Sequence, residues 1–316
     1  MTDTDSKKGS LSLPRSPLAT RRQFSRFKIA PYLYLAPALV LLITFKYWPM
    51  FFTFFLSTMK WNFINPVKHF IGFSNYIELM DRELFWTSLV NTFRYMLFIV
   101  PVQIVIPLFL ALLLTHISSN RVKPFYQAVM FTPTVLSFAI VCMIWLWMFN
   151  PSHGFLNHFI GLAGFEGISW LSEKNTALPA ISMVTNWKLL GYNFLIFYAA
   201  LQAIPSEYIE AAVIDGASSG KIFWYLKLPL LSPTTFFILV TTIIYSSDRV
   251  FIPINMLTRG GPFYSTTNLV FAIYRISFQF FNVGVASATA TITFLIFIVI
   301  TYLQIKYLQK RVHYEA

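Results

Sequence analysis

Residues 204–228 read IPSEYIEAAVIDGASSGKIFWYLKL, and they separate two apolar runs at 178–203 and 229–250. Five charged residues stand in these 25 positions, whereas only 11% of the whole chain of 316 residues is charged. The segment is therefore a polar connection between two apolar helices. It is long enough to form secondary structure of its own.

The connection carries the signals of two short helices joined by a turn. Ser206 is a candidate N-cap, and acidic residues occupy the first turns after it, where they favour the helix dipole. Asp215-Gly216 is a turn signal, and Ser218 or Ser219 is a candidate cap for a second short helix that ends before Pro229. We expect a helix, a glycine elbow and another helix that project from the apolar part of the chain.

The composition outside this connection is that of a membrane protein. Apolar residues make up 56% of the chain and aromatic residues 18%, and the mean hydropathy is +0.61. Average soluble domains are about 25% charged, so the polar surface of a soluble, disordered or nucleic-acid-binding chain is missing here. We predict an all-α polytopic membrane protein with six transmembrane helices, because six runs reach the roughly 20 apolar residues that a bilayer requires. These runs are 30–56, 89–115, 124–149, 178–203, 229–250 and 285–306. The first is too long for a signal peptide and lacks a cleavage site, so we expect it to be retained.

The Lys and Arg residues predict the direction of the spans. Residues 1–28 hold seven of the 24 cations, and the segments 116–123, 204–228 and 307–316 hold two each. The longer segments on the opposite side of the spans hold fewer cations: three in 57–88, one in 150–177 and two in 251–284. The positive-inside rule therefore places both termini in the cytoplasm. The net charge of +12 is explained by topology rather than by a nucleic-acid partner.

This topology gives the expected domain organisation. A basic cytoplasmic tail occupies residues 1–28, and the first transmembrane helix with its outer loop occupies 29–88. A five-helix core spans 89–308 and contains the cytoplasmic loop 204–229, and a short cytoplasmic tail follows at 309–316.

Ionisable residues inside the spans are candidate contacts of a transported solute, because charge in a bilayer is costly and usually faces protein or water. Lys188 lies near the middle of the fourth span, with Trp187 placed to stack and Asn193 to donate hydrogen bonds. The alternative is that Lys188 snorkels or pairs structurally. Asp248 and Arg249, in the fifth span, are either a local ion pair or a second solute contact.

No catalytic or metal-binding pattern is present in the sequence. The five histidines fall in loops or in the C-terminal tail, and Cys142 is the only cysteine. The stretch GASSGK at 216–221 lacks the glycine spacing and the Ser or Thr after the lysine that a phosphate-binding loop requires. We therefore expect a chain that is not an enzyme and binds no metal, cofactor or nucleotide.

On the outer side, residues 257–262, LTRGGP, predict a tight turn. The following stretch, 266–281, has apolar residues with helical spacing at Leu269, Ile273, Ile276 and Phe280. We expect a helix at the membrane interface or in the mouth of a translocation pathway.

The connection 204–228 resembles the EAA loop of permease subunits from binding-protein-dependent ABC importers. That pattern is EAA, three residues, Gly, nine residues and Ile-x-Leu-Pro. Here Glu210-Ala211-Ala212 is followed by Gly216 and by Leu226 to Pro229, with Leu226 in place of Ile. The stretch LTRGGP is similar to the LTxGGP segment of the carbohydrate-type subfamily, which is related to the maltose permeases. The chain is also similar to permeases of sn-glycerol-3-phosphate importers at 149–151, 192–195, 198–202 and 306–307.

The resemblance implies a permease fold that works by alternating access in a bacterial inner membrane. Its implied partners are membrane lipid, a second permease subunit (a heterodimer), two ATPase subunits that use ATP and Mg, and an extracytoplasmic solute-binding protein. The implied solute is a sugar or sugar phosphate, with sn-glycerol-3-phosphate as the candidate and other oligosaccharides or polyols as alternatives. The residues that would contact the ATPase are Glu207, Glu210, Ala211, Ala212, Asp215, Gly216, Leu226 and Pro229.

Two other classes compete with this hypothesis. A secondary transporter would show two similar halves with broken helices in matching positions, and no internal repeat is visible. A membrane-embedded enzyme or a channel would show an intramembrane acid–base or metal cluster, or a filter-like loop, and none is found in the sequence.

Overall fold

The computed structural model describes residues 29–119 and 121–308, so the expected tails 1–28 and 309–316 lie outside the described residues. Its contacts divide the chain after Met50 into two units. The first contains α1 (Ile29–Leu42), the π-helical turn η1 (Ile43–Tyr47) and the start of α2 (Trp48–Leu56). From Pro31 to Met50 its side chains are exposed, except for the half-buried Ala36 and Met50. This apolar exposure is what a lipid-facing helix requires.

Helices long and apolar enough to cross a membrane dominate the described chain. Four qualify alone, at Pro31–Leu56, Glu83–Thr115, Ser232–Thr258 and Val283–Tyr307. Two further pairs qualify together, each across a bend. If each bent pair counts as one span, the described residues contain six, which agrees with the six apolar runs of the sequence.

The second unit is a bundle built around α4 (Glu83–Thr115) and α8 (Ala177–Gln202), which pack along much of their lengths. The helix α5 (Val122–Val135) packs on α8, and the helix α12 (Ser232–Asp248) packs on α4. One apolar cluster of the core holds Tyr95, Ile99, Ile181, Ile254 and Phe271, and a second holds Ala111, Phe194, Phe197 and Ile238. The core thus follows α4 and α8 from end to end.

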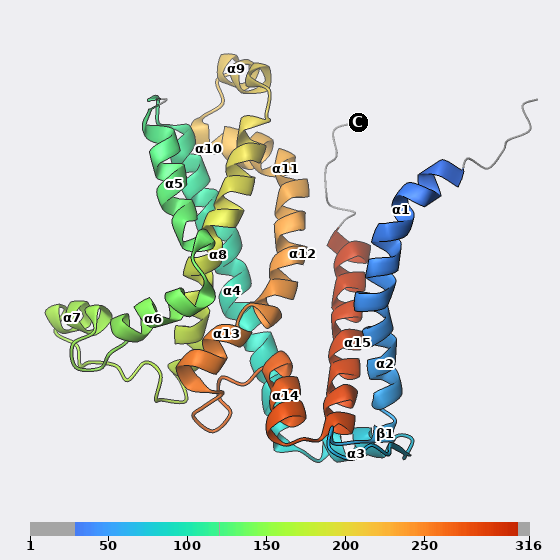
Figure 1. Cartoon of the computed structure of the whole chain (residues 1–316). Coiled ribbons are helices and arrows are strands. Elements are labelled where there is room, and N and C mark those ends of the chain that lie inside the picture. The colour runs from blue at the N-terminus through green and yellow to red at the C-terminus, as the bar shows by residue number, and fades with distance from the viewer. Residues whose placement is uncertain (1–28, 120, 309–316) are drawn as a thin grey trace, which may run out of the picture. The chain divides into compact units, whose positions relative to one another are not determined.

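Several short elements of the second unit lie at the two ends of this bundle (Figure 1). The α9 end carries α9 (Ser206–Ile214), α10 (Ser219–Ile222), the π-helical turn η2 (Phe223–Lys227) and α11 (Leu228–Leu230). The α3 end carries an antiparallel hairpin of β1 (Met59–Lys60) and β2 (His69–Phe70), with α3 (Ser74–Met80) and α14 (Leu269–Tyr274). The remaining elements are α6 (Phe138–Met148), α7 (Phe155–Leu162), α13 (Phe251–Pro253), η3 (Ile254–Thr258), η4 (Arg275–Gln279) and α15 (Val283–Leu308).

The largest difference from the sequence-based expectation is in the third span. One helix was expected over 124–149, but α5 and α6 meet at an angle of 98°. Leu136 and Ser137 are extended, and the Ser137 hydroxyl accepts a hydrogen bond from the Ile140 N–H, as an N-cap does. Ser137 therefore starts a new helix inside an otherwise apolar run.

Several helix boundaries also differ. The second span begins at Glu83 rather than near 89, because Leu84 and Phe85 are buried in a cluster with residues of α3, α14 and α15. The fifth extends past 250 to Thr258. At the α9 end, the N-cap is Pro205 rather than Ser206, and the second helical stretch runs through Pro229 to Leu230 instead of ending before it. A proline is tolerated at 229 because it occupies the first turn of α11.

Candidate functional site

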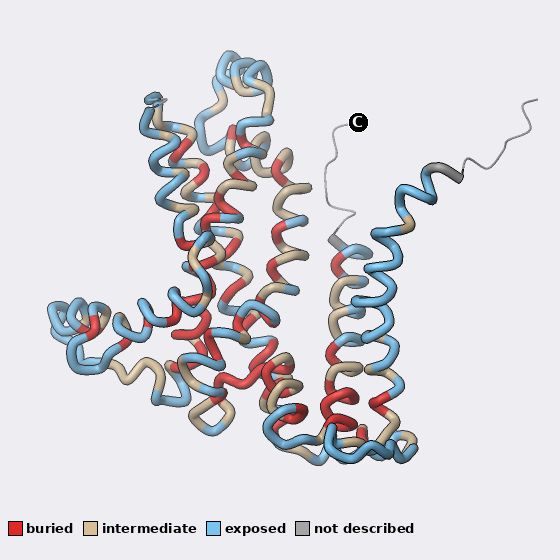
Figure 2. Tube along the Cα trace, viewed as in Figure 1, coloured by how far each residue is buried: buried red, intermediate tan, exposed pale blue. Residues whose placement is uncertain are grey.

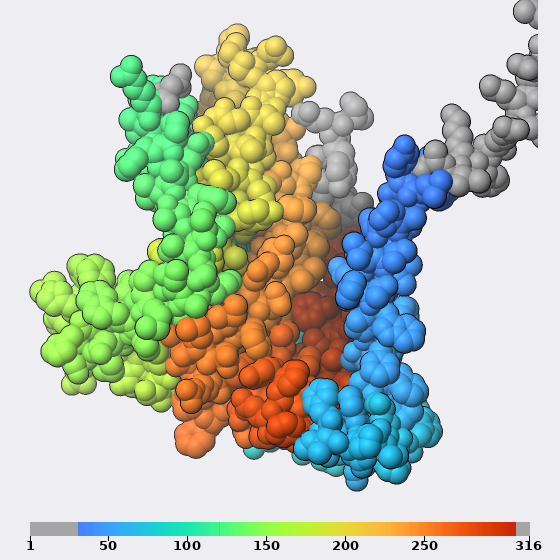
Figure 3. Space-filling model, viewed as in Figure 1, coloured from blue at the N-terminus to red at the C-terminus, as the bar shows by residue number. Residues whose placement is uncertain are grey.

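The α9 end presents a helix with no buried residue. Every side chain of α9 is exposed or half-buried, and Figures 2 and 3 show the helix standing at the end of the bundle. Its apolar residues Tyr208, Val213 and Ile214 are exposed, Ile214 by 85%. A soluble surface rarely leaves such residues uncovered, so α9 has the character of a docking element.

The predicted glycine elbow is confirmed. Gly216 has a φ of +77°, and the Ala217 N–H donates to the carbonyl of Ala212 while the Gly216 N–H donates to that of Val213. This pair of bonds is the Schellman arrangement, in which glycine takes the left-handed position. Of the eight predicted ATPase contacts, Glu207, Glu210, Ala211, Asp215 and Gly216 are exposed, and Ala212, Leu226 and Pro229 are half-buried.

A cavity of about 380 Å³ opens between the α5–α6 break, α8 and α12. Three of the five predicted solute contacts line it, namely Lys188, Asn193 and Arg249. Polar side chains of Ser137, Tyr192, Thr242 and Tyr245 also line it, together with Thr134 and the apolar Leu136, Phe138 and Leu189. The cavity therefore brings together two cations, an amide and hydroxyl groups, which is a set able to bind a polar or anionic solute.

The other two predicted solute contacts lie elsewhere. Trp187 is not among the residues that line this cavity, and its indole packs edge-on against Trp145 with ring centroids 6.0 Å apart. Asp248 lines a neighbouring cavity of about 350 Å³, which Arg249 also lines. The Asp248 carboxylate lies 3.7 Å from the Arg249 Nε, so the expected local ion pair is present.

Asn193 also has a structural partner. Its Nδ2 donates to the Gln103 side-chain oxygen at 2.9 Å, and Gln103 in turn donates to the Asn186 carbonyl at 2.8 Å. All three residues are at most 9% exposed. This buried network joins α4 to α8. Gln103 was not predicted, although a glutamine inside an apolar run is a visible signal in the sequence.

The predicted turn at 257–262 belongs to a buried polar loop at the α3 end. Gly260 has a φ of +88°, and Ser265 to Asn268 are at most 4% exposed. Two residues of α4 hold the loop: Asn91 Nδ2 donates to the Tyr264 and Thr267 carbonyls, and the Tyr95 hydroxyl donates to that of Thr266. The helix predicted after the turn is confirmed as α14 and η4, with Leu269 and Ile276 fully buried.

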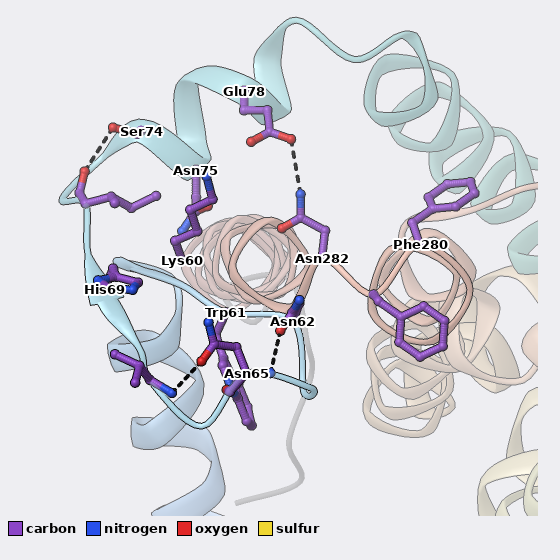
Figure 4. Close-up of a pocket in the computed structure, with 13 residues that line it drawn as sticks. Lys60, Trp61, Asn62, Asn65, His69, Ser74, Asn75, Glu78, Phe280 and Asn282 are labelled. Carbon is purple, nitrogen blue, oxygen red and sulfur yellow. Dashed lines mark hydrogen bonds between the residues drawn. The ribbon is translucent and has the colours of Figure 1, made fainter.

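Another cavity, of about 540 Å³, opens at the α3 end beside the β1–β2 hairpin (Figure 4). Most of its amides already serve the fold: Asn75 donates to the Ser57 and Met59 carbonyls, Asn62 accepts from its own turn, and Asn282 donates to Glu78 at 3.1 Å. No group of three or more His, Cys, Asp or Glu residues suited to a metal occurs in the described parts of the chain.

A helical bundle with several helices long and apolar enough to span a membrane, a cavity lined by two cations and a projecting helix fits a transporter subunit. The chain matches the family described as binding-protein-dependent transport system inner membrane component over residues 82–314, and it belongs to that family. It is therefore a multi-pass membrane subunit of an importer.

Individual relatives agree with this assignment. The sn-glycerol-3-phosphate transport system permease protein UgpA of Agrobacterium fabrum is 36% identical over 289 residues, which cover 91% of this chain and 97% of the relative. The UgpA protein of Escherichia coli O157:H7 is 32% identical over 300 residues, which cover 94% and 100%.

Solved structures show the same fold. A bacterial ABC transporter that imports the acidic polysaccharide alginate matches with a TM-score of 0.77 at 23% identity, over 89% of this chain and 95% of the other. The alginate transporter in complex with its alginate pentasaccharide-bound periplasmic protein matches with a TM-score of 0.78 at 21% identity, over 91% and 96%.

Proposed function

We propose that this chain is one of two permease subunits of an ATP-driven importer for sn-glycerol-3-phosphate or a similar small phosphorylated polyol, and that it works by alternating access. The exposed α9 is the observation that carries the coupling role. It offers apolar side chains at Tyr208, Val213 and Ile214 beside the charged Glu207 and Glu210, a combination suited to a groove on a protein partner.

The partner of α9 is an ATPase subunit in this proposal. Glu210 makes the polar contact, Ala211 and Ala212 allow close packing, and the Gly216 elbow fixes the angle between α9 and the helices that follow. ATP and Mg are used by two such ATPase subunits, and this chain contributes no catalytic group. Movement of the ATPase is thereby transmitted to α8, which α9 follows after a bend of 65°.

The orientation follows from the charges. The positive-inside rule assigns the cation-rich segments 116–123 and 204–228 to the cytoplasm, and both lie at the α9 end of the second unit (Figure 1). Both termini are cytoplasmic in this arrangement. The α3 end then faces the solute-binding protein, a partner supported by the family description and by the alginate transporter solved with its periplasmic protein.

The solute assignment rests on the cavity between α5, α8 and α12. Arg249 and Lys188 give it positive charge, and the relatives named for sn-glycerol-3-phosphate transport point to a phosphorylated solute. The second permease subunit completes the pathway, and we favour a heterodimer. A neutral oligosaccharide or polyol is the second candidate, because Tyr192, Tyr245 and Asn193 in the same lining suit sugar hydroxyl groups. Family membership leaves no support for a secondary transporter.

Reconstitution tests the solute assignment. The complete importer is placed in proteoliposomes that enclose ATP, and uptake of radiolabelled sn-glycerol-3-phosphate is measured with and without the binding protein. We expect accumulation that requires both ATP and the binding protein. Accumulation of a neutral sugar, but not of sn-glycerol-3-phosphate, would show that the solute assignment is wrong.

Cross-linking tests the coupling role separately. In a Cys142→Ala background, Val213→Cys places a thiol on exposed α9, and Phe165→Cys places a matched exposed thiol outside it, after α7. A bifunctional thiol reagent should join the first variant, but not the second, to an ATPase subunit that carries one surface cysteine. Equal cross-linking of both variants would contradict docking through α9.

A further inference from the structure

Two cations line the same cavity, and their surroundings differ. Lys188 comes from the middle of α8 and is 6% exposed. Arg249 follows the end of α12, and its side chain is 46% exposed. The sequence predicts both as candidate solute contacts, but the structure separates them.

The Lys188 ammonium is fully occupied by backbone. Its Nζ donates to the carbonyl of Pro133 at 3.0 Å and to those of Thr134 and Leu136. A lysine ammonium has three N–H donors, so three carbonyl acceptors use all of them. The Phe138 ring, 5.4 Å from Nζ, covers another side. No donor of Lys188 is left for a solute.

Those carbonyls need a partner because the helix ends there. The last carbonyls of any helix lack N–H partners within the helix, and inside a bilayer no bulk water replaces them. The chain turns extended at Leu136 and Ser137, which leaves the end of α5 uncapped by its own backbone. A cation at a helix C-terminus is also favoured by the helix dipole. Lys188 thus supplies from α8 the cap that α5 lacks.

Arg249 keeps donors for another molecule. Its one carboxylate neighbour is the adjacent Asp248, at 3.7 Å from Nε, and no other hydrogen bond of its guanidinium is recorded among the described residues. Its guanidinium lies 5.0 Å from the centre of the Tyr245 ring, which itself lines the cavity. A guanidinium offers five donors in a planar fork that suits a phosphate.

We propose that Arg249 supplies the positive charge that selects an anionic solute, and that Lys188 is a positioning residue that holds the α5–α6 break. This division rests on the proposed function for the nature of the solute. It assigns different roles to two residues of one cavity, and each role can be tested separately.

Charge restoration tests Arg249 in the reconstituted importer. Arg249→Cys, in a Cys142→Ala background, should lower sn-glycerol-3-phosphate uptake at least about tenfold, the effect of losing a hydrogen bond to a charged group. Labelling with aminoethyl methanethiosulfonate restores a positive charge and should recover much of the uptake. The negatively charged sulfonatoethyl reagent should recover none. Equal recovery with both reagents, or unchanged uptake in Arg249→Cys, overturns the assignment.

Amide hydrogen exchange tests Lys188 without any solute. Lys188→Met should speed exchange at the N–H groups of 136–140 severalfold, whereas Arg249→Gln should leave that exchange unchanged. Lys188→Met should also slow the uptake of every solute that the importer carries, because the bend shapes the whole cavity. Unchanged exchange in Lys188→Met overturns the positioning role.

The proposed function itself is tested by the solute that the unaltered importer carries. If the unaltered importer carries a neutral sugar and no sn-glycerol-3-phosphate, the solute assignment fails, and the anion-selecting role of Arg249 fails with it. The exchange result for Lys188 still decides the positioning role, because it requires no solute.

Discussion

Gly191 lies against the backbone of Met130, so closely that a Cβ at position 191 would be 2.2 Å from the Met130 carbonyl oxygen. The same Cβ would be 2.8 Å from the Cα of Phe131. These atoms are backbone and cannot rotate away. Gly191 is therefore a point of close backbone approach between α8 and α5, and it stands three residues after Lys188 on the same helix face.

Gly191→Ala should destabilise the protein, because α5 must move away from α8 to admit a methyl group. Overpacking typically costs about 1–3 kcal/mol, and backbone-to-backbone contact favours the upper end. The melting temperature of the purified protein in detergent is the measurement. Gly161→Ala in α7 is the matched control, since a Cβ there meets no atom within 4 Å. Equal melting temperatures for both variants would contradict the close approach.

Gly216→Ala should weaken the coupling of ATP hydrolysis to uptake. The residue adopts a φ of +77°, and a side chain in the left-handed region costs about 1–2 kcal/mol, so the elbow after α9 should shift. We expect fewer solute molecules transported per ATP, with normal insertion into the membrane. Gly220→Ala, four residues away in open space at an ordinary φ, should transport normally. Normal transport by Gly216→Trp would show that the coupling assignment is wrong.

The fold could be predicted from the sequence because its signals are local. Apolar length defined the six spans, and the Asp215-Gly216 pair defined the elbow. The break between α5 and α6 could not be predicted. Residues 124–149 contain no charged residue, and the cation that caps the break, Lys188, stands more than 50 residues later in the chain.

Only part of the candidate site could be predicted, because only part of its signal is local in the sequence. A charge inside a span marks Lys188 and Arg249 as unusual, but only the positions of distant backbone atoms separate a capping cation from one that faces a cavity. Trp187, the residue before Lys188, does not line the cavity, and its ring packs on Trp145 instead. The polar loop at 258–268 was predicted as a turn, but its burial depends on Asn91 and Tyr95 of α4.

Asn91→Leu should loosen that buried loop. Its Nδ2 donates to two loop carbonyls, at 2.9 and 3.0 Å, and each lost hydrogen bond costs about 1 kcal/mol with a further penalty for carbonyls left unpaired. Amide exchange across 262–268 should accelerate. Tyr95→Phe, which removes one donor, should have a smaller effect on the same amides. Leu97→Ala, at an exposed position of α4, should have none.

The hydrogen bond between Asn193 and Gln103 should appear as a coupling energy in a double-mutant cycle. Asn193→Leu leaves the Gln103 side-chain oxygen without its donor, and Gln103→Leu removes the nearest acceptor of the Asn193 amide, so each single variant should be destabilised by about 1–3 kcal/mol. The double variant should be destabilised by less than the sum, since neither member of this hydrogen bond then remains without the other. Buried side-chain hydrogen bonds in membrane proteins average about 0.6 kcal/mol and reach about 1.7 kcal/mol in such cycles.

Because Gln103 also donates to the Asn186 carbonyl, Gln103→Leu should be the more harmful single change. Unfolding of the purified protein in mixed micelles measures all four corners, and strict additivity would mean that this bond does not join α4 to α8.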